Sequence, residues 1–385
     1  MTQNILMLST TVWESPWWFR RQHFARCLAR NGWRVLYVNP QQSMARVFLG
    51  GGLAALRAAE NRSRIYSADG LSNLRIGRPP LATPYFVRSA PGSVLNRLLL
   101  RRHLRRVASR EFGGEDYTQV FYNPCDVRVV DPQLPSIYDI VDKFDAYPEY
   151  EHMQSYVNGC HRRACAVSRA MVVTAPSLIP EGWASKCTVI SNGVDLPLFR
   201  DAKARPCPAD LAGIPAPRAV YAGALLEWFD YDLLGKVARL LPHVHFVVIG
   251  FPEFKAEGMP ANVRYLGKKR QDELPAYYGH CQAGIIPFRV NPLTVHVNPL
   301  KFYEYLAADI PCVSSPMHPI ESFVERGVLA LSDNPESFAG ALLDHWKEAD
   351  KAGAREARAQ IANEHDWAQL ALQFMKVLQS SGGHS

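Results

Sequence analysis

The segment that decides the fold is Asn298-Pro-Leu-Lys-Phe-Tyr-Glu-Tyr-Leu-Ala-Ala-Asp309, which lies between the apolar runs 283–288 and 311–316. This order predicts a strand, a helix and a second strand. Asn298 can cap the helix, Pro299 suits its first position, and the proline two residues past the segment ends it. The amide N–H groups at the start of such a helix are available to an anion.

Two charged side chains on this helix indicate which anion it binds. Lys301 adds a full positive charge one turn into the helix. Glu304 lies on the same face, where a carboxylate can accept hydrogen bonds from ribose hydroxyls. Together they predict a site for a nucleotide diphosphate. The alternative is an ordinary helix of an α/β layer whose Lys301 and Glu304 are only solvated.

The same segment resembles the donor-site helix of GT-B glycosyltransferases. Their usual pattern is Glu, seven residues and a second Glu, followed by small residues and a Val-rich strand. Glu304 matches the second glutamate, and Tyr-Leu-Ala-Ala-Asp-Ile-Pro-Cys-Val-Ser-Ser-Pro follows it. His296 stands where the pattern has its first glutamate. The paired pattern accompanies retaining stereochemistry, so this departure leaves the stereochemistry open.

Two other stretches carry the same resemblance. Val189-Ile-Ser-Asn-Gly-Val-Asp195 is similar to the strand and turn that leave the first domain of many such enzymes. Tyr221-Ala-Gly-Ala-Leu-Leu-Glu-Trp-Phe-Asp230 is similar to the opening turn of the second domain in the teichuronic-acid branch of the family 4/1-like enzymes. A xanthan-type glucuronosyltransferase is a more distant relative. The resemblance implies an α/β protein of GT-B fold, in which two doubly wound Rossmann-like domains face each other across a cleft.

The apolar pattern along the chain agrees with two α/β halves. Short apolar strands alternate with helical patterns in both halves, which predicts parallel sheets with right-handed crossovers. A Pro-rich polar stretch separates the halves. We expect an acceptor- and membrane-facing domain over 1–198, a linker over 199–217, a nucleotide-sugar-binding domain over 218–364, a helix over 365–379 that crosses back to the first domain, and a disordered tail over 380–385.

Length and composition fit this organisation. The chain has 385 residues, of which 48% are hydrophobic and 21% charged, enough for two domains with separate cores. It contains no apolar run of about 18 residues, so we expect no membrane-spanning helix. Its start lacks the basic region of a signal peptide, which predicts a cytoplasmic protein.

The eight cysteines include no C-x-x-C pair, which favours free thiols. We expect neither a metal nor a cofactor.

Charge is distributed unevenly along the chain. Residues 1–110 contain 18 arginines, no lysine and three acidic residues, a net charge of +15, whereas the whole chain carries +7. The pattern over 93–111 predicts a basic amphipathic helix that docks on an anionic membrane surface, or a core-packed helix with a solvated outer face. No nucleic-acid-binding motif accompanies the charge, so we expect no nucleic acid partner. The arginines of the predicted membrane helix are Arg97, Arg101, Arg102, Arg105, Arg106 and Arg110.

Three aspartates follow a predicted strand of the first domain. Asp139, Asp142 and Asp145 lie in Tyr-Asp-Ile-Val-Asp-Lys-Phe-Asp. Inverting sugar transfer needs a base that removes the proton of the acceptor hydroxyl, and Asp142 is the first candidate. N-capping of a helix is the alternative for Asp139 or Asp145. Retaining enzymes of this fold rely on the leaving diphosphate instead, and then no base is required.

Several loops of the second domain are expected to contribute to a donor site, because open α/β sheets bind ligands at the carboxyl ends of their strands. A glycine at such an end lets the backbone approach a phosphate, and Arg289 could pair with a diphosphate bidentately. Lys268 lies where related enzymes hold the nucleotide base, although it and its two basic neighbours could be plain surface charges. The candidate donor-binding residues are Gly223, Ala224, Glu227, Trp228, Lys268, Arg289, His296, Asn298, Pro299, Lys301, Tyr303 and Glu304.

The turn after the first predicted strand is rich in aromatic residues. Flat apolar rings suit the C–H faces of sugars, and Trp also suits a membrane interface. The alternative is a packed structural cluster. The candidate acceptor-binding residues are Trp13, Trp17, Trp18, Arg20 and His23.

The resemblance implies an enzyme of cell-surface polysaccharide or exopolysaccharide synthesis. It would move a hexose from a nucleotide-diphosphate sugar to a lipid-linked or polysaccharide acceptor, as a peripheral protein at the inner face of the cytoplasmic membrane. Lys301, Arg289 and helix N–H groups would meet the charge of the leaving diphosphate, without a metal. Alternatives are a nucleotide-sugar epimerase of the same fold and a non-catalytic GT-B scaffold that binds nucleotide sugar or polysaccharide, which His296 motivates.

Overall fold

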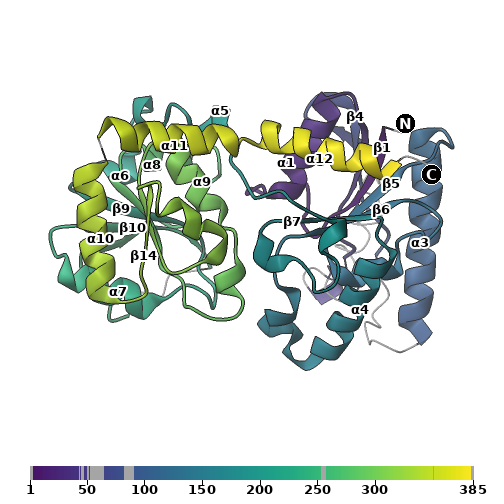
Figure 1. Ribbon diagram of the computed structural model, residues 1–385, viewed down its shortest axis with the longest axis horizontal. Helices are drawn as coiled ribbons and strands as arrows, with labels where there is room; N and C mark the ends of the chain where they lie inside the picture. The colour runs from purple at the N-terminus through teal and green to yellow at the C-terminus, as the bar shows by residue number, and fades with distance from the viewer. Residues whose placement is uncertain are drawn as a thin grey trace. The chain divides into compact units, whose positions relative to one another are not determined.

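The computed structural model describes residues 3–42, 44, 47–49, 52, 65–81, 91–252, 257–349 and 351–382. The chain folds as two compact units (Figure 1). The first unit comprises Met1–Val173, Ile179–Ile190 and Ala371–Ser385. The second unit comprises Thr174–Leu178 and Ser191–Leu370.

The first unit contains an eight-stranded sheet in the order β3-β4-β2-β1-β5-β6-β7-β8. All neighbours pair in parallel except β3 and β4. The strands are β1 (Asn4–Leu8), β2 (Arg34–Val38), β3 (Ile65–Ala68), β4 (Leu71–Gly77), β5 (Thr118–Phe121), β6 (Ser136–Ile140), β7 (Ala170–Val173) and β8 (Cys187–Val189). The helices are α1 (Arg20–Arg30), α3 (Pro91–Phe112), η1 (Pro124–Arg128), η2 (Phe144–Ala146), η3 (Pro148–Met153), α4 (Gln154–Val167) and η5 (Ala184–Lys186).

The second unit contains a six-stranded parallel sheet in the order β11-β10-β9-β12-β13-β14. The strands are β9 (Arg218–Ala224), β10 (His245–Phe251), β11 (Val263–Tyr265), β12 (Ala283–Ile286), β13 (Cys312–Ser314) and β14 (Leu329–Leu331). The helices are η4 (Pro176–Leu178), α5 (Leu196–Phe199), η6 (Ala202–Ala204), α6 (Ala209–Ala212), α7 (Tyr231–Leu240), α8 (Leu274–Tyr278), η7 (Thr294–His296), α9 (Leu300–Ala307), η8 (His318–Phe323), α10 (Pro335–Glu348) and α11 (Ala352–Glu364).

Both sheets reverse their strand order once, which defines where each unit can bind a ligand. The reversal falls between β1 and β5 in the first unit and between β9 and β12 in the second. In doubly wound sheets, ligands bind beyond the carboxyl ends of the strands at this point. The predicted α/β class and doubly wound architecture are therefore confirmed.

Close packing against β12 positions α9 in the second unit. A Cβ atom at Gly284 would lie 2.1 Å from the Tyr305 ring, so only a glycine lets this ring rest on the strand. Tyr305 itself is fully buried in the core. The helix that carries Lys301 and Glu304 is thus held directly on the sheet.

The boundaries of the units differ from the expected ones. The segment 199–217, expected as a linker, includes η6 and α6 and belongs to the second unit. Phe199, Ala202 and Leu211 are buried in that unit's core, which explains why the segment is folded.

The last helix, α12, extends over Trp367–Gly382. The chain passes from the second unit to the first between Leu370 and Ala371, inside this helix. In the first unit, the Phe374 ring stacks on Phe24 of α1 with 4.8 Å between ring centres. Residues 380–382 of the expected tail belong to α12, and residues 383–385 lie outside the described part of the chain.

Candidate functional site

A lysine of α9 crosses the carboxyl end of β9 in the second unit. A side chain at Gly223 would lie 3.0 Å from Lys301 Cε, so the glycine leaves space for this lysine. Lys301 Nζ lies 5.1 Å from the centre of the Tyr221 ring and 5.0 Å from that of Phe288. Aromatic faces attract an ammonium group. The structure thus brings Gly223 and Lys301 together at the switch point of the sheet, as the sequence predicts.

The Lys301 ammonium lies in a poorly hydrated position. Desolvation lowers its pKa to about 8, although the nearby Glu304 carboxylate acts in the opposite direction. A doubly charged ligand at this position would favour the protonated form. Lys301 is therefore suited to bind an anion such as a diphosphate.

Glu304 is 8% exposed and lies one turn beyond Lys301. The Tyr278 hydroxyl donates a hydrogen bond to Glu304 Oε2 over 3.1 Å. Burial raises the pKa of the carboxyl group, while Lys301 and Tyr278 partly offset this effect. Because the Tyr278 hydroxyl holds one of its oxygens, the Glu304 carboxylate has a fixed position in which it can accept hydrogen bonds from hydroxyl groups.

The start of α9 differs from the prediction in two respects, the capping residue and the position of Pro299. The helix begins at Leu300, its N-cap is Pro299, and no side chain caps it. The prediction that Asn298 caps this helix is wrong, because its side-chain amide donates to the Thr174 carbonyl over 2.9 Å. Asn192 in turn donates to the Asn298 carbonyl over 2.8 Å. The first-turn amides of α9 thus lack a side-chain cap and remain suited to an anion.

The basic residues in the predicted donor loops fall into two groups. Lys269 forms an ion pair with Asp210, and Arg270 forms one with Asp272, so surface pairing accounts for both. Lys268 is exposed, and its Nζ lies 4.8 Å from the centre of the Phe251 ring. The Arg289 side chain is exposed beyond β12, and its backbone N–H donates to the Trp228 carbonyl over 2.8 Å.

The other predicted donor residues occupy varied positions. Tyr303 is buried and stacks on His365, with 4.6 Å between ring centres, so it supports the core of the unit. His296 lies in η7, with its ring centre 5.6 Å from that of His318. Glu227 is exposed, whereas Ala224 and Trp228 are partly buried.

A pocket at the far end of α9 and groups of metal-ligating side chains are the other features that could indicate a site in this unit. A pocket of about 490 Å³ lies at the C-terminal end of α9, where its lining includes Asp309 and Arg355 but none of the predicted donor residues. Within the described ranges, no three His, Cys, Asp or Glu residues are grouped to hold a metal ion. One Asp-x-Asp is present, but Asp230 caps α7 through Leu233 N and Asp232 pairs with Lys236.

The three predicted aspartates of the first unit have different environments. Asp139 is completely buried and forms an ion pair with Arg20 over 2.8 Å. It therefore joins β6 to α1 and caps no helix, since the N-cap of the following η2 is Lys143. Asp145 lies within η2, and its backbone carbonyl accepts a hydrogen bond from Gln154.

Asp142 is a desolvated carboxyl group with one hydrogen-bond donor beside it. It lies two residues beyond β6 and accepts a hydrogen bond from the Tyr147 hydroxyl over 2.9 Å. Desolvation raises its pKa to about 6, although this hydrogen bond and the Arg21 charge lower it. A carboxylate with this pKa is ionised at neutral pH and still basic enough to accept a proton.

Two further residues of the first unit, Asp126 and Arg21, were assigned no role from the sequence. Asp126 lies in η1, just beyond β5, and burial raises its pKa to about 7. The Arg21 guanidinium lowers the pKa values of both Asp126 and Asp142, which places positive charge near both carboxyl groups. Arg21 lies over the Tyr122 ring at 4.8 Å and donates to Thr11 Oγ1 over 3.3 Å. The only sequence signal for Asp126 was its place after a buried strand.

The aromatic turn after β1 is mainly structural. Trp13 is buried, with its ring centre 4.8 Å from that of Trp18 and 5.2 Å from that of Tyr37. His23 is also buried, and desolvation lowers its pKa well below the usual value. Trp17 and Trp18 are partly exposed, so these two are the members of the cluster that a ligand could reach.

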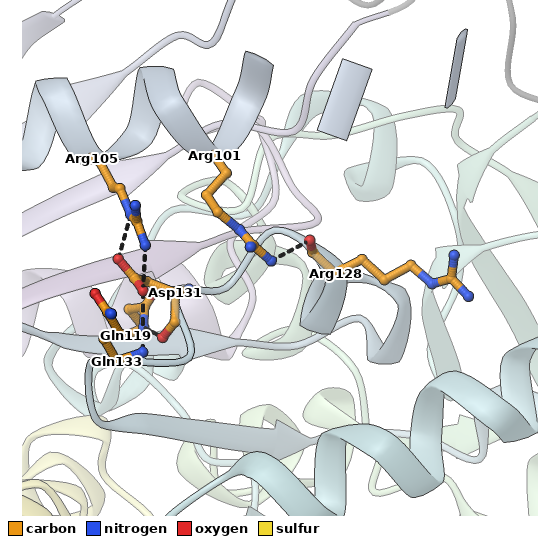
Figure 2. Close-up of polar contacts among 6 residues, drawn as sticks. All are labelled: Arg101, Arg105, Gln119, Arg128, Asp131 and Gln133. Carbon is orange, nitrogen blue, oxygen red and sulfur yellow. Dashed lines mark hydrogen bonds and ion pairs between the residues drawn. The ribbon is translucent and has the colours of Figure 1, made fainter. Parts of the chain in front are cut away.

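The predicted basic helix exists as α3, and two of its arginines anchor it. Arg105 forms two hydrogen bonds of 2.5 and 2.7 Å with the Asp131 carboxylate (Figure 2). Arg101 donates to the Arg128 carbonyl over 2.8 Å. Gln119 exchanges two hydrogen bonds with the Asp131 backbone, so the loop that receives both arginines is itself held in place.

The remaining arginines of α3 are available to solvent. Arg97 is partly exposed, whereas Arg102, Arg106 and Arg110 are exposed. Among the helices of the described residues, none is long and apolar enough to cross a membrane.

Comparisons with known proteins agree with this architecture. Residues 216–348 match the family model described as Glycosyl transferases group 1. TuaH of Bacillus subtilis (strain 168), named as a teichuronic acid biosynthesis glycosyltransferase, is 27% identical over 201 residues, which cover half of this chain and half of that protein. The chain thus spans about half the length of this curated relative.

Solved structures match the whole chain. Sucrose-phosphate synthase from Thermosynechococcus elongatus has a TM-score of 0.69 at 16% identity, and the match covers 98% of both chains. Anabaena Alr3699/HepE in complex with UDP has a TM-score of 0.68 at 15% identity and covers 99% of this chain and 100% of its own. The protein therefore has the GT-B fold. The match of residues 216–348 to the glycosyl transferases group 1 model lies in the second unit and agrees with the resemblance to GT-B glycosyltransferases.

Proposed function

We propose that the protein is a glycosyltransferase that takes a hexose from a nucleotide-diphosphate sugar. Solved structures of the same fold are described as complexes with UDP, UDP-glucose or UDP-2-fluoro glucose. The observation that carries the proposal is the Lys301 ammonium over Gly223, beside the uncapped start of α9. This arrangement offers a full charge and backbone N–H groups to one diphosphate.

In this proposal, the second unit binds the donor and stabilises the leaving group. Negative charge grows on the diphosphate as the sugar carbon departs, and pre-oriented cations and N–H groups stabilise that charge. Lys301 and the first-turn amides of α9 would act in this way, with the exposed Arg289 as a further cation. Glu304 would accept hydrogen bonds from the ribose hydroxyls. No metal ion is required in this scheme.

The first unit would bind the acceptor and supply the base. Asp142, with its pKa of about 6, would remove the proton of the acceptor hydroxyl as that oxygen attacks the sugar carbon. Trp17 and Trp18 are the aromatic residues that a sugar ring could reach. We further propose that the acceptor is a lipid-linked or polysaccharide intermediate of cell-surface polysaccharide synthesis, as the name of TuaH suggests.

A donor panel tests the proposal. The protein is incubated with UDP-, GDP- and dTDP-hexoses, with and without a lipid extract that contains polyprenyl-linked saccharides, and the released nucleoside diphosphate is measured. We expect acceptor-dependent release with one donor, which Lys301→Ala abolishes and Lys269→Ala retains. Conversion of a donor to its epimer would indicate an epimerase. Donor binding without turnover would indicate a non-catalytic scaffold, and either result would refute the proposal.

A further inference from the structure

The helix α3 presents two different faces. Leu104, Ala108 and Phe112 are buried, and Arg101 and Arg105 bond to the loop beneath them. The 3.6-residue periodicity of a helix places positions 95, 99, 102 and 106 on the opposite side, and position 98 at the edge between the two sides. We call these five residues the outer face of α3.

The N-terminal half of the outer face is apolar and exposed. Leu95 and Leu98 are each 56% exposed, and Leu99 is 50% exposed. Single exposed leucines are common on protein surfaces, but three on adjacent positions of one helix face form a contiguous apolar patch. Such patches mark surfaces that bind a partner or a membrane.

The C-terminal half of the outer face is basic. Arg102 and Arg106 are exposed, and the next turn adds the exposed Arg110. These three arginines have no ion pair with any residue that the structure describes. The helix contains no acidic residue before Glu111, and Glu111 pairs with Arg75. The positive charge of this half is therefore not neutralised by the helix itself.

We propose that the outer face of α3 docks on a bilayer that contains anionic phospholipids, with the leucines in the interface and the arginines on the headgroups. Helices that lie on a membrane gain affinity from the apolar area that they bury at the headgroup boundary and from basic residues that meet anionic lipids. A nucleic acid would use the arginines but leave the leucines in water. A second copy of this chain would bring another uncompensated set of arginines toward the first. The inference deepens the proposed function, because the docked unit is the one proposed to receive a lipid-linked acceptor.

Vesicle sedimentation of the full chain tests the docking face without any turnover. The vesicles contain phosphatidylcholine alone or with 30% phosphatidylglycerol, at low and high salt. Each basic residue near an anionic surface accounts for roughly a fivefold change in partitioning. We therefore expect R102S/R106S to weaken binding to the anionic vesicles by roughly 25-fold, and L95S/L98S/L99S to weaken it by more than tenfold.

Matched variants elsewhere on the chain serve as controls. R162S/R163S removes the same charge from exposed positions of α4 in the same unit, and L240S removes an exposed leucine from α7. Both should bind vesicles within about twofold of the unmodified protein. Circular dichroism melts show that each variant is folded.

Several results would overturn the docking face. These are sedimentation that does not depend on anionic lipid, equal loss in the control variants, or retention in the leucine variant. Binding to duplex DNA that depends on the arginines alone would assign the face to nucleic acid. Loss of a dimer in light scattering of the leucine variant without lipid would assign it to a second copy. UDP binding by the same preparations is measured separately, so that failure of the proposed glycosyltransferase activity is not confused with failure to dock.

Discussion

Replacing Asp142 with asparagine should make the protein more stable and less active. Folding raises the pKa of this carboxyl group from 3.8 to about 6 because it is desolvated. The folded protein therefore holds more protons than the unfolded chain between about pH 4 and 6, and stability falls as the pH rises through this range. Above pH 6 the full cost of the buried carboxylate is present.

The magnitude follows from the pKa change. About two pKa units at 1.36 kcal/mol per unit correspond to roughly 3 kcal/mol, which we reduce to about 2 kcal/mol because the side chain is only partly buried. Asparagine removes this cost but can still accept the Tyr147 hydrogen bond. At pH 8, Asp142→Asn should thus raise the free energy of unfolding by about 2 kcal/mol. Transfer activity should fall by about 10²- to 10⁴-fold, because the base is lost.

Urea titrations at pH 8, 6 and 4.5, combined with nucleoside diphosphate release at pH 8, measure both effects. The stability gain should shrink as the pH falls, because the unmodified carboxyl group is then protonated in the folded state. Asp145→Asn serves as the control, since Asp145 lies in the adjacent η2 and should change neither quantity substantially. Equal stability of Asp142→Asn and the unmodified protein at pH 8, or a gain at pH 4.5 as large as the gain at pH 8, would refute the reasoning.

Three further outcomes are expected. Gly284→Ala should lower the free energy of unfolding by about 1–3 kcal/mol in urea titrations, because the new Cβ would lie 2.1 Å from the Tyr305 ring. The control Gly213→Ala, whose Cβ would have no neighbour within 4 Å, should leave this free energy unchanged. UDP affinity should decrease as the pH rises through about 8, where Lys301 loses its proton, and calorimetry of Lys301→Arg should show no such decrease. Arg20→Leu should lower the free energy of unfolding by about 3–5 kcal/mol in thermal or urea unfolding, because it leaves the Asp139 carboxylate buried without this partner. A decrease of less than about 1 kcal/mol would contradict the structural role of the Arg20–Asp139 pair.

The parts of the site that depend on local pattern could be predicted from the sequence. The periodicity of 298–309 and its flanking strands predicted α9, and the position of Lys301 on that helix followed from its spacing. The glycine at the end of β9 was predicted for the same reason, because strand ends and turns have local signals. These features depend on residues close together in the chain.

The errors concern side chains whose partners are distant in the chain. Asn298 looked like a helix cap, but its amide binds Thr174, 124 residues earlier. The partner of Asp139 was not foreseen either, because it is Arg20, 119 residues away. A polar residue after a strand has the same local signal whether it lines a site or joins two elements. Only the tertiary contacts distinguish the two.

The arginines of α3 illustrate the same limit. Their spacing predicted a basic helix correctly, yet all six were treated as one surface. The structure separates Arg101 and Arg105, which hold the helix to its own unit, from the exposed Arg102 and Arg106. The orientation of the helix depends on Asp131 and on the loop that carries it, which no local pattern revealed.

The central claim is that Lys301 and the start of α9 bind the diphosphate of a nucleotide sugar. Titration calorimetry of UDP with the unmodified protein, Lys301→Ala and Lys269→Ala tests it most directly. Loss of one charge-assisted interaction should weaken UDP binding by about tenfold to a hundredfold in Lys301→Ala. Lys269→Ala, which removes a lysine paired with Asp210, should bind UDP like the unmodified protein. Unchanged UDP affinity in a folded Lys301→Ala variant would contradict the account.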